Sequence, residues 1–587
     1  METRRTILLM VFGLSLILLW DRWQAYNNRN APHGQPPAIS APAPTAAPSP
    51  GTVSAAPEGA PATAAVAGQA GGLEAAGGAV SSGERIQIET DLVRAEFDPL
   101  GASLVRVELP KEKQPPDWTE QGLTKLLHLS NLVHSMGFGH AGGESDIVLL
   151  QTTAQRTYEA RSGLTGGSPQ DPFPNHRATR FSVSSGPRTL APGQDTLTVR
   201  FEAEAGGVRL VKTLTFRRGH YDIAVSHDVT NVGSAAVTPA LYLELVRDGG
   251  KAVDESTFAR SYTGPAFYTQ ASKYKKVSFE DIEKNKAEVP QPADDGWFAV
   301  VQHYFVAGYV PAAGARRDFY AETLKPGELY RVGARVTLPT LAPGASSSEQ
   351  ATLYVGPQEQ KTLEAIAPGL DLVADYGSLT FIAKPLFWLL GALHWGVSNW
   401  GWAIVLLTVL IKGMFYPLSA ASYKSMAKMK ELQPRMAKMK EQYGEDRQKL
   451  QLAMMELYKK EQINPLMGCL PIAVQIPVFL ALYWVLLASV EMRNAPWILW
   501  IRDLAAPDPW FVLPVVMMAS MWVQYKLNPT PPDPVQARMM AIMPFVFGVM
   551  FFFFPAGLVL YWVVNNALSI LQQWRITQVV ARAKKPG

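Results

Sequence analysis

Cysteine is almost absent: the 587 residues contain one, Cys469. This excludes a disulfide framework and any zinc site that uses several cysteines. Charge is also scarce, because Asp, Glu, Lys and Arg make up 18% of the chain, and 54 basic residues nearly balance 50 acidic ones. A net charge of +4 does not indicate a nucleic-acid binder. Since the mean hydropathy is +0.01, the apolar residues are expected to gather in particular segments.

Long uncharged runs are what the sequence has instead. A helix that crosses a bilayer needs ~20 mostly apolar residues. The last run is too long for one helix, and a Pro-Ala-Gly turn divides it into 539–554 and 558–574, each shorter than a hydrocarbon core of ~30 Å. The sequence therefore predicts six transmembrane helices, from the runs 7–20, 397–423, 463–490, 509–525 and the two halves of 539–574.

The N-terminal run has two interpretations. Its apolar part is short, as in a cleaved signal peptide. However, no small-x-small cleavage site follows it, and Trp20, Trp23 and Tyr26 resemble an aromatic belt at a membrane interface. An uncleaved transmembrane anchor over residues 1–26 is the favoured interpretation.

Basic residues predict the orientation of the helices, because they accumulate in short cytoplasmic loops. Ten lie between the second and third predicted spans, and others follow the last span in a basic tail, 576–587. Both termini are therefore predicted to be cytoplasmic. The large segment between the first two spans is predicted to lie in the periplasm.

That large segment has two parts, which differ in composition and in hydrophobic pattern. Residues 27–83 are rich in Ala, Pro and Gly and poor in large apolar side chains, which predicts a disordered tether. From residue 84 to 375 the pattern alternates with period 2, with glycines at turns, which predicts a periplasmic antiparallel β-sandwich. Its histidines are scattered without the close spacing of metal ligands, so no metal site is predicted.

Two helical segments adjoin the membrane part. Residues 376–396 are apolar but interrupted by Pro385 and are predicted to form an interfacial amphipathic helix. Residues 424–461 have a helical pattern broken at Gly444, which predicts a cytoplasmic helical hairpin with a methionine-lined seam. A solvated connector without a role of its own is the alternative. The hairpin's candidate recruitment residues are Lys428, Lys430, Arg435, Lys438 and Lys440.

Lys412 is the most informative single residue, because a lysine at membrane depth is costly and is by default a functional candidate. A structural ion pair is one alternative, but the uncharged runs contain no Asp or Glu. Snorkelling to the interface is another. Polar residues at helical spacing near it predict a hydrated, positively charged groove: Thr408, Lys412 and Ser419 in the second span, Gln475 in the third, and Asn565, Ser569 and Gln572 in the last.

Six short motifs carry a family resemblance. In order and spacing they resemble the YidC membrane protein insertases, and the large outer domain resembles the Gram-negative branch, whose domain is a β-supersandwich. The motifs are IKGMFYPL (411–418), SMAKM (425–429), LQP (432–434), NPLMGC (464–469), QIPVF (475–479) and FPAGLVLY (554–561).

The resemblance implies a five-helix insertase core over 397–575, with a groove open to the cytoplasm and to lipid. Lys412 stands where the family usually has arginine, and the family's substrate-contacting threonine and tyrosine fall on Thr408 and on Trp562, which follows Tyr561. It also implies an apolar slide along the third and fifth spans, with Ile476, Phe479, Met543, Phe547 and Met550 as candidate residues.

The function implied is insertion and folding of nascent inner-membrane proteins, alone or with the Sec translocon. Further implied partners are the ribosome, the signal-recognition-particle pathway and membrane lipids, and the location is the bacterial inner membrane. No bond is made or broken, so neither enzyme activity, a cofactor nor a small-molecule substrate is expected. The alternatives are a secondary transporter with an intramembrane lysine site and a membrane-anchored protein that binds or converts a periplasmic sugar.

Overall fold

The computed structural model describes residues 84–114, 117–128, 130, 145–250, 262–443, 446–461, 467, 470–528 and 534–582. The predicted anchor, 1–26, and the predicted tether, 27–83, lie outside the described residues. Both predictions therefore stay untested.

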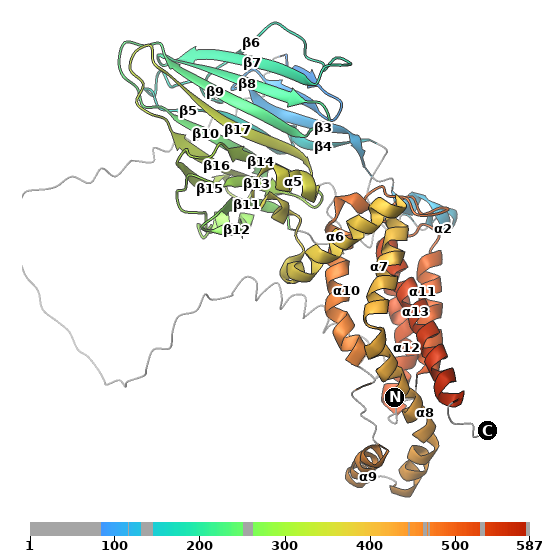
Figure 1. Ribbon diagram of the computed structural model, residues 1–587. Helices are drawn as coiled ribbons and strands as arrows, with labels where there is room; N and C mark the ends of the chain where they lie inside the picture. Colours follow the sequence, from blue (N-terminus) through green and yellow to red (C-terminus); the bar gives the residue numbers. More distant parts are fainter. Residues whose placement is uncertain are drawn as a thin grey trace, which may run out of the picture. The chain divides into compact units, whose positions relative to one another are not determined.

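The first half of the described chain forms two antiparallel sheets that pack face to face (Figure 1), which confirms the predicted β-sandwich. The eight-stranded sheet has the order β1 (Ile86–Glu89), β2 (Arg94–Asp98), β3 (Ser103–Lys113), β4 (Asp146–Thr152), β5 (Thr157–Thr165), β10 (Ala240–Asp248), β16 (Leu329–Thr337), β15 (Arg317–Lys325). The nine-stranded sheet has the order β12 (Lys273–Lys276), β11 (Gly264–Thr269), β13 (Trp297–Val301), β14 (Phe305–Pro311), β17 (Ser346–Pro357), β9 (Asp222–Asn231), β8 (Val208–Arg217), β7 (Thr196–Ala205), β6 (Ser182–Val183).

The β7–β8 hairpin shows how the sequence dictates this architecture. Along β7 every second side chain is buried, so one face joins the core and the other meets solvent. Gly206 and Gly207 form the two-residue turn with φ of 58° and 74°, a backbone region that glycine enters without a Cβ penalty. Turn and alternation together fix the register, in which Ala205 pairs with Val208.

A polar group lies inside the sandwich, between the two sheets. The ammonium of Lys212 on β8 donates to Gly101 O at 2.6 Å and to Ser162 O at 2.7 Å, and it lies 4.7 Å from the centre of the Phe181 ring. His227 Nε2 and the Ser162 hydroxyl are hydrogen-bonded at 2.9 Å. Burial lowers the pKa of Lys212 to about 7 and that of His227 to about 3.

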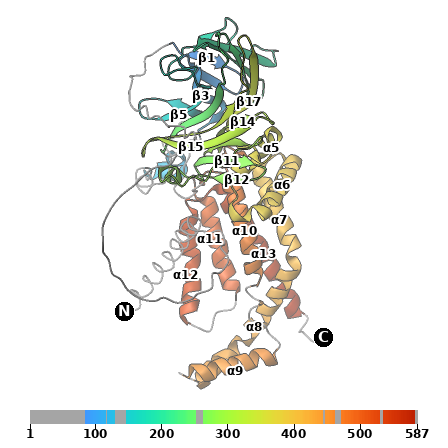
Figure 2. The ribbon, with the colours of Figure 1, turned by 90° about the vertical axis from the view of Figure 1, so that its left-hand side faces the viewer.

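Three short helices lie between strands of the first half: η1 (Trp118–Glu120), α2 (Gly122–Leu126) and α4 (Phe279–Glu283). The second half of the described chain is helical, and it begins with the short helices α5 (Gln360–Ile366), η2 (Leu370–Val373) and η3 (Gly377–Leu379). The main helices are α6 (Thr380–Val397), α7 (Trp400–Met414), α8 (Tyr416–Tyr443), α9 (Arg447–Lys460), α10 (Leu470–Ala488), α11 (Val512–Leu527), α12 (Pro534–Phe551) and α13 (Ala556–Arg582), with η5 (Val490–Met492) after α10. Helices α7 and α10–α13 run side by side in both views (Figures 1 and 2).

The second predicted span is not one straight helix. It breaks at Phe415, and α7 and α8 meet at an angle of 66°. Pro417 explains the break, because proline has no N–H for the carbonyl of Gly413 and its ring would collide with that carbonyl. The expectation that Ser419 continues the face of Thr408 and Lys412 was therefore wrong, since it assumed an unbroken helix.

The last helix is longer than expected. Helix α13 has 27 residues and runs through Trp574 and Arg575 to Arg582, so at ~1.5 Å per residue it extends for about 40 Å. The predicted last span, 558–574, therefore lies within a longer helix. The charged side chains that were taken as its end lie on exposed turns of a continuing helix.

By length and hydropathy, none of the helices in the described ranges would cross a membrane alone. The bent pair Trp400–Met414 and Tyr416–Tyr443 meets the same criteria when the two helices are taken together.

Two glycines of α7 give a matched test of packing. A Cβ on Gly401 would collide with the Cβ, Cγ and Cδ1 atoms of Trp497, whereas a Cβ on Gly413 would meet open space. We expect Gly401→Ala to destabilise the protein by ~1–3 kcal/mol through overpacking. Gly413→Ala is expected to be neutral or to stabilise by up to ~1 kcal/mol, because alanine favours the helix. Thermal unfolding of the full chain in detergent measures both, and equal melting temperatures would contradict the packing argument.

Lys212 predicts a pH dependence of stability. Its pKa in the folded chain is about 7 against an ordinary 10.5, so between these values the unfolded chain binds more protons and stability rises with pH. We expect the melting temperature of the wild type, relative to Lys212→Met, to increase from pH 7 to pH 9.5. His227 stays neutral throughout this window. A pH-independent difference between the two proteins would show that Lys212 does not titrate on unfolding.

Candidate functional site

The ammonium group of Lys412 lies inside the helical bundle. Lys412 is on α7 and is 6% exposed. Its Nζ donates to Ser569 Oγ of α13 at 2.7 Å and to Gln475 Oε1 of α10 at 3.4 Å. Both acceptors are neutral, and no carboxylate in the described part of the chain lies within ion-pair distance of Lys412. The side chain of Lys412 is therefore covered by its neighbours in this arrangement.

Gln475 links Lys412 to two further residues of α13, which lie one and two turns before Ser569. While its Oε1 accepts from Lys412, its Nε2 donates to Asn565 Oδ1 and, at 3.4 Å, to the hydroxyl of Tyr561. The structure thus brings together five of the residues that the sequence singles out. We call this set, Lys412, Gln475, Tyr561, Asn565 and Ser569, the lysine network.

The other predicted groove residues lie outside the lysine network. Thr408 is 1% exposed and donates to Ile404 O, one turn earlier in α7, at 2.7 Å. Ser419 is buried on α8, beyond the bend at Phe415. Gln572 lies one turn after Ser569 on α13, and its buried Oε1 has no hydrogen-bond partner among the described residues.

Trp562 separates the lysine network from an apolar surface. Its indole ring lies against Phe479 of α10 at 4.8 Å and against Phe551 of α12 at 5.8 Å, measured between ring centres. Tyr561, the neighbouring residue, also stacks on Phe479, with ring centres 6.2 Å apart. Of the predicted slide residues, Ile476 and Met543 are exposed, whereas Phe479, Phe547 and Met550 are partly buried against the bundle core.

Sequence reasoning missed several polar side chains between the helices. On another face of α13, Asn566 donates to Ser520 Oγ at 3.0 Å and Gln573 donates to Asn528 Oδ1 at 3.1 Å, both on the α11 side. Asn566 and Gln573 are seven residues apart, so their spacing along α13 is the signal that indicates a second polar stripe.

The predicted cytoplasmic hairpin is formed by the end of α8 together with α9. The two helices pack against each other through Met429, Leu432, Met436, Met454, Leu457 and Tyr458, which confirms a methionine-containing seam. Arg435 Nη1 and Glu461 Oε1 form an ion pair at 2.8 Å across the hairpin. The side chains of Lys428, Lys430, Arg435, Lys438 and Lys440 are exposed.

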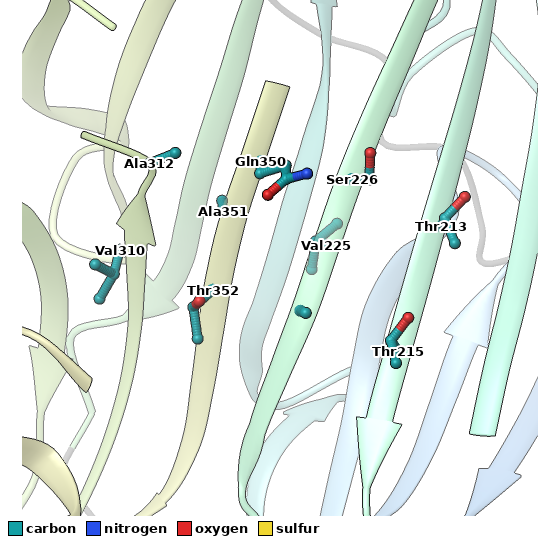
Figure 3. Close-up of a pocket in the computed structure, with 10 residues that line it drawn as sticks. Thr213, Thr215, Val225, Ser226, Val310, Ala312, Gln350, Ala351 and Thr352 are labelled. Carbon is teal, nitrogen blue, oxygen red and sulfur yellow. The ribbon is translucent and has the colours of Figure 1, made fainter. Parts of the chain in front are cut away.

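A separate depression lies on the outer face of the nine-stranded sheet (Figure 3). Its lining comes from β8, β9, β14 and β17, and it presents neutral hydroxyl, amide and methyl groups around Ala224. The lining residues carry no charge, so they supply no acid, base or ion-pair partner for catalysis. No group of three or more His, Cys, Asp or Glu side chains within the described ranges is suited to hold a metal ion.

The lysine network can bind a strong hydrogen-bond acceptor through the ammonium of Lys412. An ammonium held only by neutral oxygens keeps its charge uncompensated, so it attracts a carboxylate or another strong acceptor that comes within reach. An ammonium has three N–H donors and two are used here, so such a group either takes the third donor or replaces Ser569 or Gln475. Binding and release of a polar group, rather than bond chemistry, is what this arrangement supports.

Comparisons with known proteins agree with this division into two parts. The family model "YidC periplasmic domain" matches residues 85–389, and "60Kd inner membrane protein" matches residues 392–584. A protein named membrane protein insertase YidC from Cupriavidus metallidurans is 52% identical over 100% of this chain and 99% of its own. The protein of the same name from Burkholderia multivorans is 49% identical over the full length of both chains.

A solved structure titled an active YidC insertase with its first transmembrane domain resolved covers 84% of this chain and 92% of its own, at 17% identity and a TM-score of 0.38. The assignment rests on the full-length relatives and not on this likeness. They select the insertase over the secondary transporter and the sugar-binding protein. The chain belongs to the YidC family of membrane protein insertases, with a periplasmic domain joined to an inner-membrane insertase core.

Proposed function

We propose that Lys412 draws the polar part of a nascent membrane protein into the bundle. In this mechanism a carboxylate or backbone carbonyl of the substrate replaces Gln475 or Ser569 as acceptor. The supporting observation is that Lys412 is 6% exposed and its ammonium is hydrogen-bonded to the neutral oxygens of Gln475 and Ser569. A neutral acceptor is exchanged at small cost, whereas a buried carboxylate partner would resist displacement.

The apolar part of the substrate takes a different path in this proposal. We assign it to the surface of α10 and α12, where Ile476 and Met543 are exposed beside the aromatic contact of Phe479, Trp562 and Phe551. The buried Nε1 of Trp562, beside this surface, has no acceptor among the described residues.

Recruitment is proposed to occur at the hairpin of α8 and α9. Its exposed lysines and Arg435 suit an anionic surface such as ribosomal RNA or lipid headgroups. Its methionine seam adapts to apolar segments of different shape. Cooperation with the ribosome, the signal-recognition-particle pathway, the Sec translocon and membrane lipids belongs to this proposal and follows from the family.

The role of Lys412 predicts that charge matters more than shape. We expect Lys412→Arg to support insertion of a short single-span substrate with an acidic translocated tail, in proteoliposomes of the full chain. Lys412→Met, which keeps the length but not the charge, is expected to slow that insertion roughly ten- to a hundredfold, the value of a lost charge-assisted hydrogen bond. A substrate with an uncharged tail is the control and should lose less. Equal rates for Lys412→Met and the wild type would refute the electrostatic role.

The hairpin predicts a salt-dependent interaction with ribosomes. We expect replacement of Lys428, Lys430, Lys438 and Lys440 by glutamine to weaken binding of ribosome–nascent chain complexes at least about tenfold at low salt. The difference should shrink as salt rises, because charges are screened beyond ~10 Å at 0.1 M. Co-sedimentation with proteoliposomes measures the binding.

The matched control variant instead replaces four exposed lysines of the periplasmic domain, 84–375. It should bind ribosome–nascent chain complexes as the wild type does. These lysines are Lys111, Lys284, Lys325 and Lys361. Arg435 stays unchanged in both variants, because its ion pair with Glu461 supports the hairpin itself. Equal losses in both variants would assign the effect to overall charge rather than to the hairpin.

A further inference from the structure

The residues that follow α10 are held by the periplasmic sandwich. The side chain of Arg493 is 2% exposed, and its Nη1 lies 3.7 Å from Glu112 Oε2 at the end of β3. Its guanidinium carbon lies 5.2 Å from the centre of the Phe305 ring, within the range of a cation–π contact. The next residue, Asn494, donates from Nδ2 to Lys113 O at 3.2 Å. An ion pair, an aromatic contact and a hydrogen bond thus join this end of the α10–α11 loop, 489–511, to the sandwich.

The short helix η5, in the same part of the loop, contributes side chains to two hydrophobic cores. Val490 belongs to the buried cluster of the sandwich, whereas Met492 belongs to the buried cluster of the helical bundle. Their exposed fractions are 7% and 1%. Because protein cores are close-packed, η5 cannot move away from either domain without leaving a cavity there. The loop therefore follows the sandwich as well as the bundle.

The other end of the loop is held by α2, which is also part of the sandwich domain. The amide of Leu123 donates to Pro509 O at 2.9 Å, just before α11 begins at Val512. This amide lies in the first turn of α2, where an N–H has no acceptor within its own helix. The approach is close, since a Cβ on Gly122 would lie 2.1 Å from Pro509 O. The φ of 53° at Gly122 is likewise one that glycine adopts without a Cβ penalty.

The two helices that the loop joins both bond to α13. Helix α10 does so through Gln475 and Asn565, and α11 does so through Ser520 and Asn566. A fixed separation of α10 and α11 at the loop therefore supports both sets of polar contacts on α13. Residues of the sandwich domain hold both ends of that loop.

We propose that these residues, Glu112, Lys113, Gly122 and Leu123, form a brace through which the periplasmic domain fixes the adjoining ends of α10 and α11. The brace acts as one unit, so that loss of its contacts at one end of the loop loosens the other end. Arg493 is its positioning residue on the side of the bundle. The brace goes beyond the proposed function, because it gives the periplasmic domain a role in the core that does not depend on the attraction of substrate.

Hydrogen exchange tests whether the two ends of the loop are coupled. The full chain in nanodiscs is analysed by hydrogen–deuterium exchange and peptide mass spectrometry. We expect Arg493→Ala to accelerate exchange of the Leu123 amide, at the opposite end of the loop, roughly two- to tenfold, the value of a lost cation–π contact. Arg502→Ala is the matched control, because it replaces an exposed arginine of the same loop, and it should exchange as the wild type does. The amides of β8 are the internal reference for an intact sandwich.

The coupling is expected to act in the opposite direction as well. Gly122→Ala places a Cβ against Pro509 O and should accelerate exchange of the amides of η5. Gly193→Ala is the control for backbone strain, because Gly193 also has a positive φ, 83°, but nothing lies within 4 Å of its Cβ position. In the Gly122→Ala background, Arg493→Ala should add little to the exchange rate of the Leu123 amide. Unchanged exchange of that amide in Arg493→Ala alone would overturn the proposal.

A distance measurement tests the consequence for α10 and α11. Spin labels are attached through Leu480→Cys on α10 and Val515→Cys on α11, both at exposed positions, and Cys469→Ser removes the native thiol. We expect Arg493→Ala to broaden the distribution of distances between the labels, and Arg502→Ala to leave it unchanged. The same width in Arg493→Ala and the wild type would show that the sandwich does not fix these helices, and it would reject the brace. Neither measurement requires a substrate, so the brace and the groove role are tested separately.

Discussion

A single buried ammonium group constrains the helical half of the molecule. Lys412 lies in the last turn of α7, and a buried charge is costly unless hydrogen bonds satisfy it. No carboxylate within the described ranges offsets this cost for Lys412, so neutral oxygens must do so. They come from α10 and α13, which means that three helices have to keep their relative positions for the lysine to remain hydrogen-bonded.

Helix α13 meets this constraint with two polar stripes that face different neighbours. Asn565 and Ser569 belong to the lysine network, while Asn566 and Gln573 bond to the α11 side. Residues one position apart on a helix point about 100° apart, so a turn of α13 about its axis would break both stripes together. The second stripe therefore supports the lysine network without touching it.

The sequence predicted most of the architecture because its signals are local and periodic. Alternation along β7, with Gly206 and Gly207 after it, is sufficient to predict paired antiparallel strands. Likewise, the position of Lys412 within a long apolar run was sufficient to single it out. The helical spacing of Asn565 and Ser569 added these two residues to the prediction. The strand order of the two sheets depends on long-range pairing, such as β5 with β10, and no local pattern encodes it.

The prediction failed where the spacing of side chains along one helix was applied across the break between α7 and α8. The spacing from Thr408 to Ser419 has meaning only on a continuous helix, and Pro417 interrupts that helix. The change of direction at Phe415 sets α8 at 66° to α7, so side chains of this one predicted span do not share one face.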